Sequence, residues 1–268
     1  MIVYPNAKIN LGLFITEKRD DGFHNILSCF YPVDWRDALE IIPAKKTSFS
    51  STGITIPGNP SENLCLKAHH ILKTHHQCPD VAIHLHKNIP IGAGLGGGSA
   101  DASFMLKALN ELFELNISTQ QLEQYAKTLG SDCAFFIENK SKICYNKGDE
   151  FDDCLIDLKQ YNILLFYPNI HVGTQEAYRN IAPKTIDKSI IYDLEKSPVH
   201  EWKHFLRNDF ETSVFSNYPQ LNDLKKKFYD AGAIYAAMTG SGSTLYGIFK
   251  KNHKPTIDFG MEGLLHWC

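Results

Sequence analysis

Residues 90–103 read PIGAGLGGGSADAS, and five of these fourteen residues are glycine. The preceding stretch, DVAIHLHKNIP at 80–90, alternates as a strand does, and a helical pattern runs from Ser99 to about Phe113. Glycines permit positive φ and close backbone approach, and the start of a helix carries unpaired N–H groups that attract anions. The stretch therefore predicts a phosphate-binding loop. The alternative is a flexible turn, which needs only one or two glycines.

Two common nucleotide-binding motifs do not fit the residues around this loop. Gly92, Gly94 and Gly97 satisfy G-x-G-x-x-G, but a second helix comes next where a dinucleotide-binding unit needs a parallel strand ending in an acidic residue. A phosphate loop of the Walker type ends in Gly-Lys-Ser/Thr, whereas residues 98–100 are Gly-Ser-Ala. The sequence therefore predicts a phosphate loop without a lysine of its own.

The rest of the chain predicts alternating strands and helices. KINLGLFI at 8–15 reads as a strand with its odd-numbered residues toward the core, and Asp21-Gly22 marks a hairpin turn. Ser61 is a possible cap for a helix over 61–76, and Ser118 with Gln121 caps a helix that ends before Gly130. Further strands are expected at 133–137, 141–150, 161–168 and on both sides of a glycine loop within 233–249, and further helices at 172–181, 200–215 and 219–232.

Composition narrows the class of protein. The chain has 268 residues, 43% hydrophobic and 21% charged, with a formal net charge of -3. The chain has no excess of basic residues that would indicate binding to nucleic acid. No apolar run is long enough to span a membrane. We expect no signal peptide at the N-terminus, and seven cysteines without a CxxC pair suggest reduced thiols in a cytoplasmic protein. We expect His69, His70, His75 and His76 on the surface, without a metal. The acidic segment 149–160 predicts a boundary between domains 1–155 and 156–268.

Three segments together resemble the GHMP kinases. PIGAGLGGGSADAS is similar to the family's phosphate loop, AKINLGLFI at 7–15 to its N-terminal motif, and AAMTGSGSTLYGIF at 236–249 to its C-terminal glycine loop. The resemblance implies an α+β fold with an N-terminal nucleotide-binding domain, a C-terminal ferredoxin-like α/β sandwich domain, and an active site in the cleft between them. It further implies a kinase that uses ATP and Mg²⁺ to phosphorylate a small alcohol.

KRDDGFHNI at 18–26 and LGSDCAFF at 129–136 are most similar to members whose substrate is a cytidine diphosphate conjugate. Two positions depart from that pattern. Phe23 stands where tyrosine is usual, and SDCAFF lacks a common proline. Two rival interpretations stay open: a GHMP kinase for another alcohol such as homoserine or mevalonate, and a catalytically silent nucleotide sensor. The oligomeric state is unknown from the sequence.

By this resemblance, the catalytic residues are Asp132, which accepts the proton of the alcohol, and Lys8 beside it. The alternatives are a turn residue for Asp132 and a solvated strand lysine for Lys8. The resemblance and the loop pattern together assign ATP binding to Asn63, Lys87, Pro90, Gly92, Gly94, Leu95, Gly96, Gly97, Gly98, Ser99 and Ala100. Ser99 is also the candidate ligand of Mg²⁺, or it simply caps the helix.

Substrate binding is assigned by the same resemblance. The residues are Asn10, Phe23, His24, Thr174, Tyr178, Gly240, Ser241 and Gly242. His24 would hydrogen-bond the edge of the cytosine ring, Tyr178 would stack on its face, and Asn10 would bind the alcohol part. The alternative to base stacking is that Tyr178 is a core aromatic on an amphipathic helix.

Overall fold

The computed structural model describes residues 1–179 and 181–268, which form two compact units. The first unit contains residues 1–7, 34–91 and 96–140, and the second contains 8–33, 92–95 and 141–268. The glycine loop therefore contributes residues to both. The sequence predicts a single boundary near residue 155. That boundary stays a prediction, because these units are defined by compactness alone.

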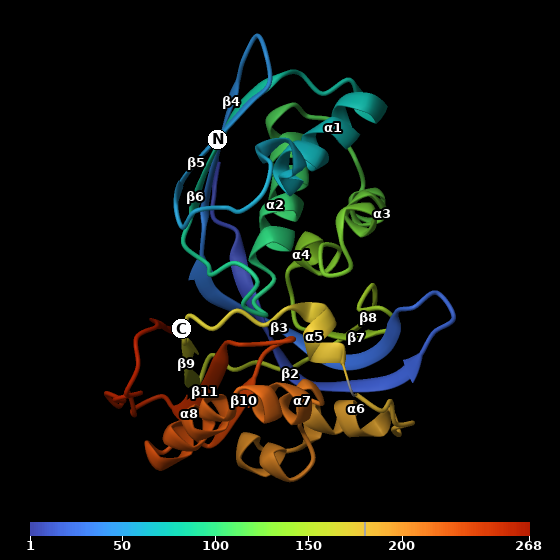
Figure 1. Ribbon diagram of the computed structural model, residues 1–268. Helices are drawn as coiled ribbons and strands as arrows, with labels where there is room; N and C mark the ends of the chain where they lie inside the picture. Colours follow the sequence, from blue (N-terminus) through green and yellow to red (C-terminus); the bar gives the residue numbers. More distant parts are fainter. Residues whose placement is uncertain (180) are drawn as a thin grey trace. The chain divides into compact units, whose positions relative to one another are not determined.

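The first unit has a four-stranded sheet in the order β1-β4-β6-β5, with helices beside it (Figure 1). β6 runs antiparallel to β4 and parallel to β5, and Leu39 lies opposite Leu85. The strands are β1 (Ile2–Val3), β4 (Ala38–Pro43), β5 (Ser48–Gly53) and β6 (Val81–Lys87). The helices are α1 (Leu64–His76), α2 (Gly97–Leu112), α3 (Thr119–Leu129) and the short α4 (Phe135–Glu138).

Local signals explain where two of these helices begin. The Ser118 side chain accepts a hydrogen bond from Gln121 N at 3.2 Å, and Gly130 ends α3, which confirms the predicted cap and stop. The predicted cap of α1 at Ser61 is wrong. Ser61 lies in a short 3-10 turn, and the side chain of Asn63 caps α1 by accepting from Cys65 N at 2.9 Å.

Two further predictions for the first unit are wrong. Residues 133–137 lie in a turn and in α4 rather than in a strand, and the side chains of Phe135, Phe136 and Ile137 are all buried. His69 is buried, not on the surface, because it shares one helix face with Cys65 and Leu72. Its Nε2 lies 2.9 Å from the carbonyl oxygen of Pro79.

The second unit has two four-stranded sheets, in the orders β2-β3-β7-β8 and β10-β11-β9-β12. The strands are β2 (Asn6–Lys18), β3 (His24–Arg36), β7 (Lys142–Tyr145), β8 (Glu150–Asp153), β9 (Tyr161–Tyr167), β10 (Tyr235–Met238), β11 (Leu245–Lys250) and β12 (Leu264–Trp267). The helices are α5 (Thr174–Tyr178), α6 (Ser189–Lys196), α7 (Phe210–Asn217) and α8 (Pro219–Asp230). α8 packs on β10 and β11, and Phe228 and Phe249 belong to the same core.

The predicted helix over 200–215 is interrupted. A 3-10 turn covers Val199–His204, and α7 begins only at Phe210. Between them, Leu13 N donates to Arg207 O and Asp209 N donates to Leu13 O, both at 2.8 Å, so residues 207–209 add to the edge of β2. Residues 6–15 are buried on both faces of the strand.

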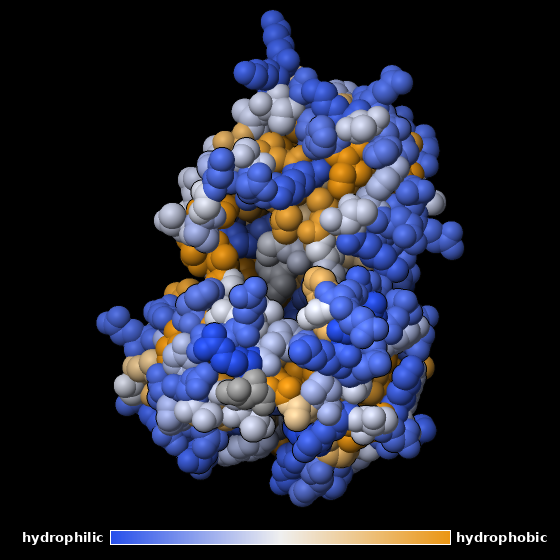
Figure 2. All heavy atoms as spheres, turned by 45° about the vertical axis from the view of Figure 1, so that its right-hand side comes forward, coloured by the Kyte–Doolittle hydropathy of each residue, from blue (hydrophilic) through white to orange (hydrophobic). Residues whose placement is uncertain are grey.

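The surface is mainly hydrophilic and the cysteines are mainly buried. Figure 2 shows hydrophilic residues over much of the visible face of each unit, with smaller apolar patches between them. Six of the seven cysteines are buried, and Cys268 is partly exposed. Among the described residues, no helix is long and apolar enough to cross a membrane, and no group of three or more His, Cys, Asp or Glu side chains could hold a metal.

Candidate active site

Three segments far apart in the sequence meet in the second unit. Lys8 N donates to Leu95 O at 2.9 Å, Thr239 Oγ1 donates to Gly94 O at 3.1 Å, and Thr244 N donates to Ala93 O at 3.3 Å. The start of β2, the glycine loop and the loop after β10 are thus held together by hydrogen bonds. The sequence singles out these same three segments as motifs.

Glycine is required where two of these segments touch. Gly94 has φ +79°, and a Cβ there would overlap the carbonyl of Thr239. Gly240 has φ +54°, and a Cβ there would lie 2.9 Å from the Cα of Gly94. Neither position accepts a side chain, because the backbone of the neighbouring segment occupies the space that the added Cβ would need.

Lys8 is a buried cation with polar and aromatic neighbours. Its ammonium, 3% exposed, donates to Asn10 Oδ1 at 2.7 Å and lies 4.6 Å from the centre of the Phe30 ring. Asn10 Oδ1 also accepts from Gly240 N at 2.9 Å, and Asn10 Nδ2 donates to Ser28 Oγ at 2.9 Å. The amide of Asn10 is therefore used within the protein, where it orients Lys8 and the loop at Gly240.

The first unit places Ser99 beside the turn that carries Asp132. Ser99 lies in the first turn of α2, and a Cβ on Gly130 would be 3.9 Å from Ser99 Oγ and 3.3 Å from Cys133 Sγ. Ser103 Oγ donates to Cys133 O at 2.6 Å, which fixes the turn against the helix. Burial raises the pKa of the Cys133 thiol to about 12, so this thiol stays neutral. Ser99 and Asp132 are both partly exposed.

A buried ion cluster lies at the base of the loop. The Lys87 ammonium donates to Asp101 Oδ2 at 2.7 Å and also to Asp37 Oδ2, and each of these side chains is at most 4% exposed. Asp37 Oδ1 accepts from Asn88 N at 2.6 Å and from Ile89 N at 2.8 Å. The cluster thereby ties the chain before the loop to the helix after it.

Charge and burial oppose each other in this cluster. Desolvation raises the pKa of Asp101 to about 7, against the attraction of Lys87, and its Oδ1 atom has no hydrogen-bond partner. Burial alone would lower the pKa of Lys87, but the two carboxylates together raise it. A Cβ on Gly97 would lie 3.0 Å from Lys87 Nζ, so the ammonium lies directly under the loop.

In the second unit, the predicted base-binding residues are in contact. The His24 ring stacks on Tyr178 with centroids 4.6 Å apart and planes at 18°, and Phe210 meets Tyr178 edge-on at 4.7 Å. Burial, together with the charge of Lys18, lowers the pKa of His24, so its ring is neutral at pH 7 and can both donate and accept. Phe23 is 61% exposed, and Lys147 Nζ lies 5.5 Å from the centre of its ring.

The remaining predicted residues occupy varied environments. The buried residues are Pro90, Leu95, Gly97, Ala100, Gly240 and Gly242. The partly exposed residues are Gly94, Gly96 and Ser241, and the exposed ones are Gly92, Gly98 and Thr174. A Cβ on Gly98 would have no atom within 4 Å, so its backbone is open. Asn63 is partly exposed, and its side-chain oxygen caps α1.

Sequence reasoning missed several residues that build this site. Asn208 Nδ2 donates to Met238 O and Gly240 O, both at 2.8 Å, and so supports the loop after β10. Asp37 and Asp101 hold Lys87, and the Lys147 ammonium lies over the Phe23 ring. Thr239 lies within the motif at 236–249 and could have been identified from the sequence. Asn208 and Asp37 have no local pattern that marks them.

Comparison with known proteins agrees with this arrangement. Residues 63–140 match the family model for the GHMP kinases N terminal domain, and 190–257 match the model for the GHMP kinases C terminal region. The chain therefore belongs to the GHMP kinase family.

Several similar proteins carry the same name. A Cytophaga hutchinsonii protein named 4-diphosphocytidyl-2-C-methyl-D-erythritol kinase is 54% identical over 256 residues, covering 95% of this chain and 94% of that protein. A Bacteroides thetaiotaomicron protein of the same name is 52% identical, covering 97% and 96%. A crystal structure of 4-(cytidine 5'-diphospho)-2C-methyl-D-erythritol kinase aligns with a TM-score of 0.78 at 29% identity, covering 92% of this chain and 90% of that one. A homoserine kinase from Cytophaga hutchinsonii aligns at 0.64 and 18% identity, covering 91% and 85%, and shares the fold.

Proposed function

We infer that the protein is a kinase that transfers a phosphoryl group to 4-diphosphocytidyl-2-C-methyl-D-erythritol. The observation that carries this inference is the 54% identity, over 95% of the chain, to a protein of that name. ATP is the proposed phosphoryl donor and the 2-hydroxyl of the erythritol the proposed acceptor, in the cytoplasmic non-mevalonate route to isoprenoid precursors. The proposed domains are an N-terminal one over 1–155 and a C-terminal one over 156–268.

The phosphates of ATP would bind the glycine loop and the first turn of α2. The exposed backbone of Gly98 and the positive end of the sixteen-residue α2 suit a polyphosphate. Lys87 would hold the loop from below, because its ammonium is already bound by two carboxylates. Asn63, at the start of α1, is the proposed neighbour of the adenine.

Mg²⁺ fits the oxygen donors in the first unit. The partly exposed Ser99 hydroxyl and Asp132 carboxylate lie on adjacent elements, and Mg²⁺ prefers a few oxygen ligands and keeps several waters. When bound, the ion would neutralise charge on the phosphates.

The chemistry of the transfer is assigned to two side chains. Asp132 would accept the proton of the attacking hydroxyl as its oxygen bonds to phosphorus. Lys8 would stabilise negative charge that develops on the transferring group, and Asn10 would hold the Lys8 ammonium in position. Lys8 is already buried, so little further desolvation is needed when the substrate binds. In this environment of low dielectric constant, its positive charge interacts strongly with nearby negative charge.

The cytosine would bind at His24 and Tyr178. In the structure these rings stack on each other, so a base that stacks on the same face of Tyr178 must replace His24, which can then hydrogen-bond the edge of the base. Phe23 and Thr174 would complete the wall of the cytosine site. The loop at Gly240, Ser241 and Gly242 would cover the end of the substrate that carries the acceptor hydroxyl. Phe210 keeps Tyr178 oriented by its edge-on contact.

A direct assay tests the proposal. The purified protein with ATP and Mg²⁺ is offered the cytidine substrate, homoserine or mevalonate, and phosphorylated product is measured by mass spectrometry. We expect product only from the cytidine substrate. Product from homoserine or mevalonate instead would favour a different kinase of this family, and ATP binding without any product would favour a sensor.

A further inference from the structure

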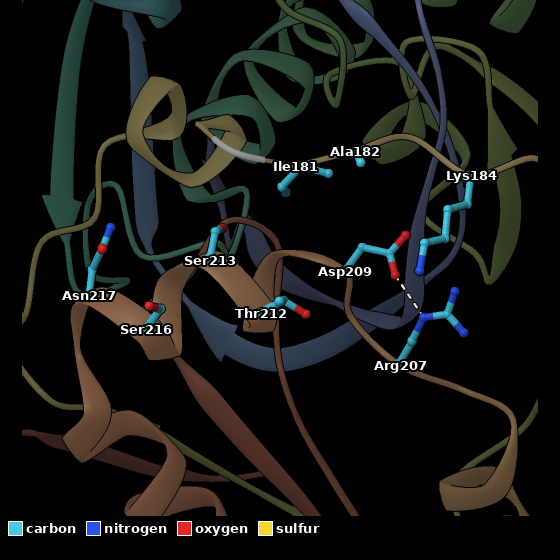
Figure 3. A pocket seen from close by; sticks show the side chains of 9 residues that line it. All are labelled: Ile181, Ala182, Lys184, Arg207, Asp209, Thr212, Ser213, Ser216 and Asn217. Carbon is cyan, nitrogen blue, oxygen red and sulfur yellow. Dashed lines mark hydrogen bonds and ion pairs between the residues drawn. The ribbon is translucent and has the colours of Figure 1, made fainter.

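The second unit also contains a pocket that is lined by none of the residues assigned to the chemistry. It has a volume of about 410 Å³ and is formed between residues 181–184 and the segment that leads into and along α7 (Figure 3). This volume is within the range of small-molecule sites. None of the residues that line it belongs to the site described above.

One end of this pocket is cationic. Figure 3 shows Lys184 and Arg207 together next to the carboxylate of Asp209, and the Arg207 guanidinium is bonded to Asp209 through Nε at 2.8 Å. Asp209 Oδ2 also accepts from Ile15 N at 2.9 Å, so both carboxylate oxygens are occupied. The two cations exceed this single anion by one charge, and the Nη groups of a guanidinium bound through Nε can still donate. This end suits a phosphate group.

The wall formed by α7 is polar, whereas Ile181 and Ala182 form an apolar part of the lining. Thr212, Ser213 and Ser216 lie along α7, with Asn217 at the end of the helix far from the cations (Figure 3). Ser213 Oγ donates to Ala177 O at 2.7 Å, which leaves its lone pairs able to accept. A body with several hydroxyl groups would find donors and acceptors along this helix.

The walls of the pocket continue into the proposed substrate site. Ser213 bonds the carbonyl of Ala177, the residue before Tyr178, and Phe210 at the start of α7 touches the Tyr178 ring. Between Arg207 and Asp209 lies Asn208, whose amide holds the carbonyl of Gly240 at 2.8 Å. A ligand that draws these walls together would therefore act on the base-stacking ring and on the loop after β10.

The same segment is bonded to the strand that carries Lys8. Residues 207–209 pair with Leu13, and Lys184 N donates to Ile15 O at 3.0 Å, so both sides of the pocket attach to β2. Elements that share backbone hydrogen bonds shift together more readily than elements joined by a flexible linker.

We propose that this pocket binds a small phosphorylated polyol and that its occupancy regulates substrate binding. The phosphate would lie at Lys184 and Arg207, and the hydroxyl groups along α7. The regulatory part of the proposal rests on the kinase activity proposed above, whereas the binding part does not.

Binding is tested by calorimetry with glycerol 3-phosphate as the probe. The protein is first saturated with a non-hydrolysable ATP analogue and the cytidine substrate, so that the anion-binding groups of the active site are filled. We expect binding to the wild type, at least tenfold weaker binding to Lys184→Met, and unchanged binding to Lys159→Met. Lys159 is the matched control because it is 88% exposed and lies outside the pocket. Ser216→Ala should weaken glycerol 3-phosphate without weakening inorganic phosphate.

Kinetics test the regulatory part. Saturating glycerol 3-phosphate should change KM for the cytidine substrate by about fivefold in the wild type, within the ordinary range of allosteric coupling, and should leave Lys184→Met unaffected. No binding to the saturated protein, or equal binding to wild type and Lys184→Met, overturns the site. Binding with an unchanged KM overturns the regulation. A protein that binds the probe but phosphorylates nothing would refute the proposed function and leave the site intact.

Discussion

Replacing Lys87 with methionine would leave the carboxylates of Asp37 and Asp101 together inside the first unit without their cation. All three side chains are at most 4% exposed, so water cannot substitute for the missing ammonium. Removing one partner of a buried ion pair costs about 3–5 kcal/mol, a large part of the roughly 5–15 kcal/mol that keeps a domain folded. We therefore expect the Lys87→Met protein to be folded but markedly less stable at pH 8.

The loss should depend on pH. The pKa of Asp101 is already raised to about 7, above its unfolded value, and removing Lys87 raises it further. A group whose pKa is higher in the folded state favours folding at low pH, and this contribution is lost as pH rises through the folded pKa. At pH 6 the protonated Asp101 can donate a hydrogen bond to Asp37, so the variant should lose less stability at pH 6 than at pH 8.

Urea unfolding at both pH values measures these losses. The matched control is Lys73→Met, because Lys73 forms its ion pair with Asp80 at 2.7 Å on the surface, with side chains 48% and 29% exposed. Exposed pairs contribute about 0–1 kcal/mol. A loss at pH 8 no larger than that of the control, or an equal loss at the two pH values, would refute the role given to the cluster. KM for ATP should also rise in Lys87→Met, because Asp37 and Asp101 no longer fix the two ends of the loop.

Asp132→Asn should keep the melting temperature and lower kcat by about 10²–10⁴-fold, the usual contribution of a general base; near-normal turnover would remove Asp132 from the chemistry. Lys8→Met should also lower kcat by orders of magnitude, and a change confined to KM would contradict its assigned role. Tyr178→Ala should raise KM for the cytidine substrate about 5–150-fold, from the roughly 1–3 kcal/mol of base stacking, with KM for ATP as the internal control. Gly94→Ala should lower both stability and kcat, since its Cβ would overlap Thr239 O; a fully active, stable variant would show that the loop contact is dispensable.

Local signals in the sequence were enough for the helices whose ends are marked by caps. The cap at Ser118 and the stop at Gly130 depend on neighbours within one turn, and the structure confirms both. The apolar run 133–137 carries no such mark. Five apolar residues satisfy a buried strand and a buried helical turn equally well, and tertiary packing around Phe135 and Phe136 decided for the turn.

The site could be predicted as a set of motifs but not as a set of contacts. Lys87 was found because it precedes the glycine loop, yet its partner Asp37 lies 50 positions earlier in an unremarkable segment. Asn208 supports Gly240 from 32 positions away, within a stretch whose pattern predicts a helix. Such partners are chosen by the fold, and a single sequence contains no local feature that distinguishes them from surface residues.

The division of the chain between the two compact units has a consequence during synthesis on the ribosome. Chains emerge from the N-terminus, and domains generally fold as they become complete. The first unit is complete once residue 140 has emerged, but most of the second consists of residues 141–268. Its strands β2 and β3 are made before the first unit is complete, and their apolar faces stay uncovered until residues 141–268 have emerged. The order of translation therefore exposes the strand that carries Lys8 for longest, and the nascent protein depends on a slow, long-range closure to protect it.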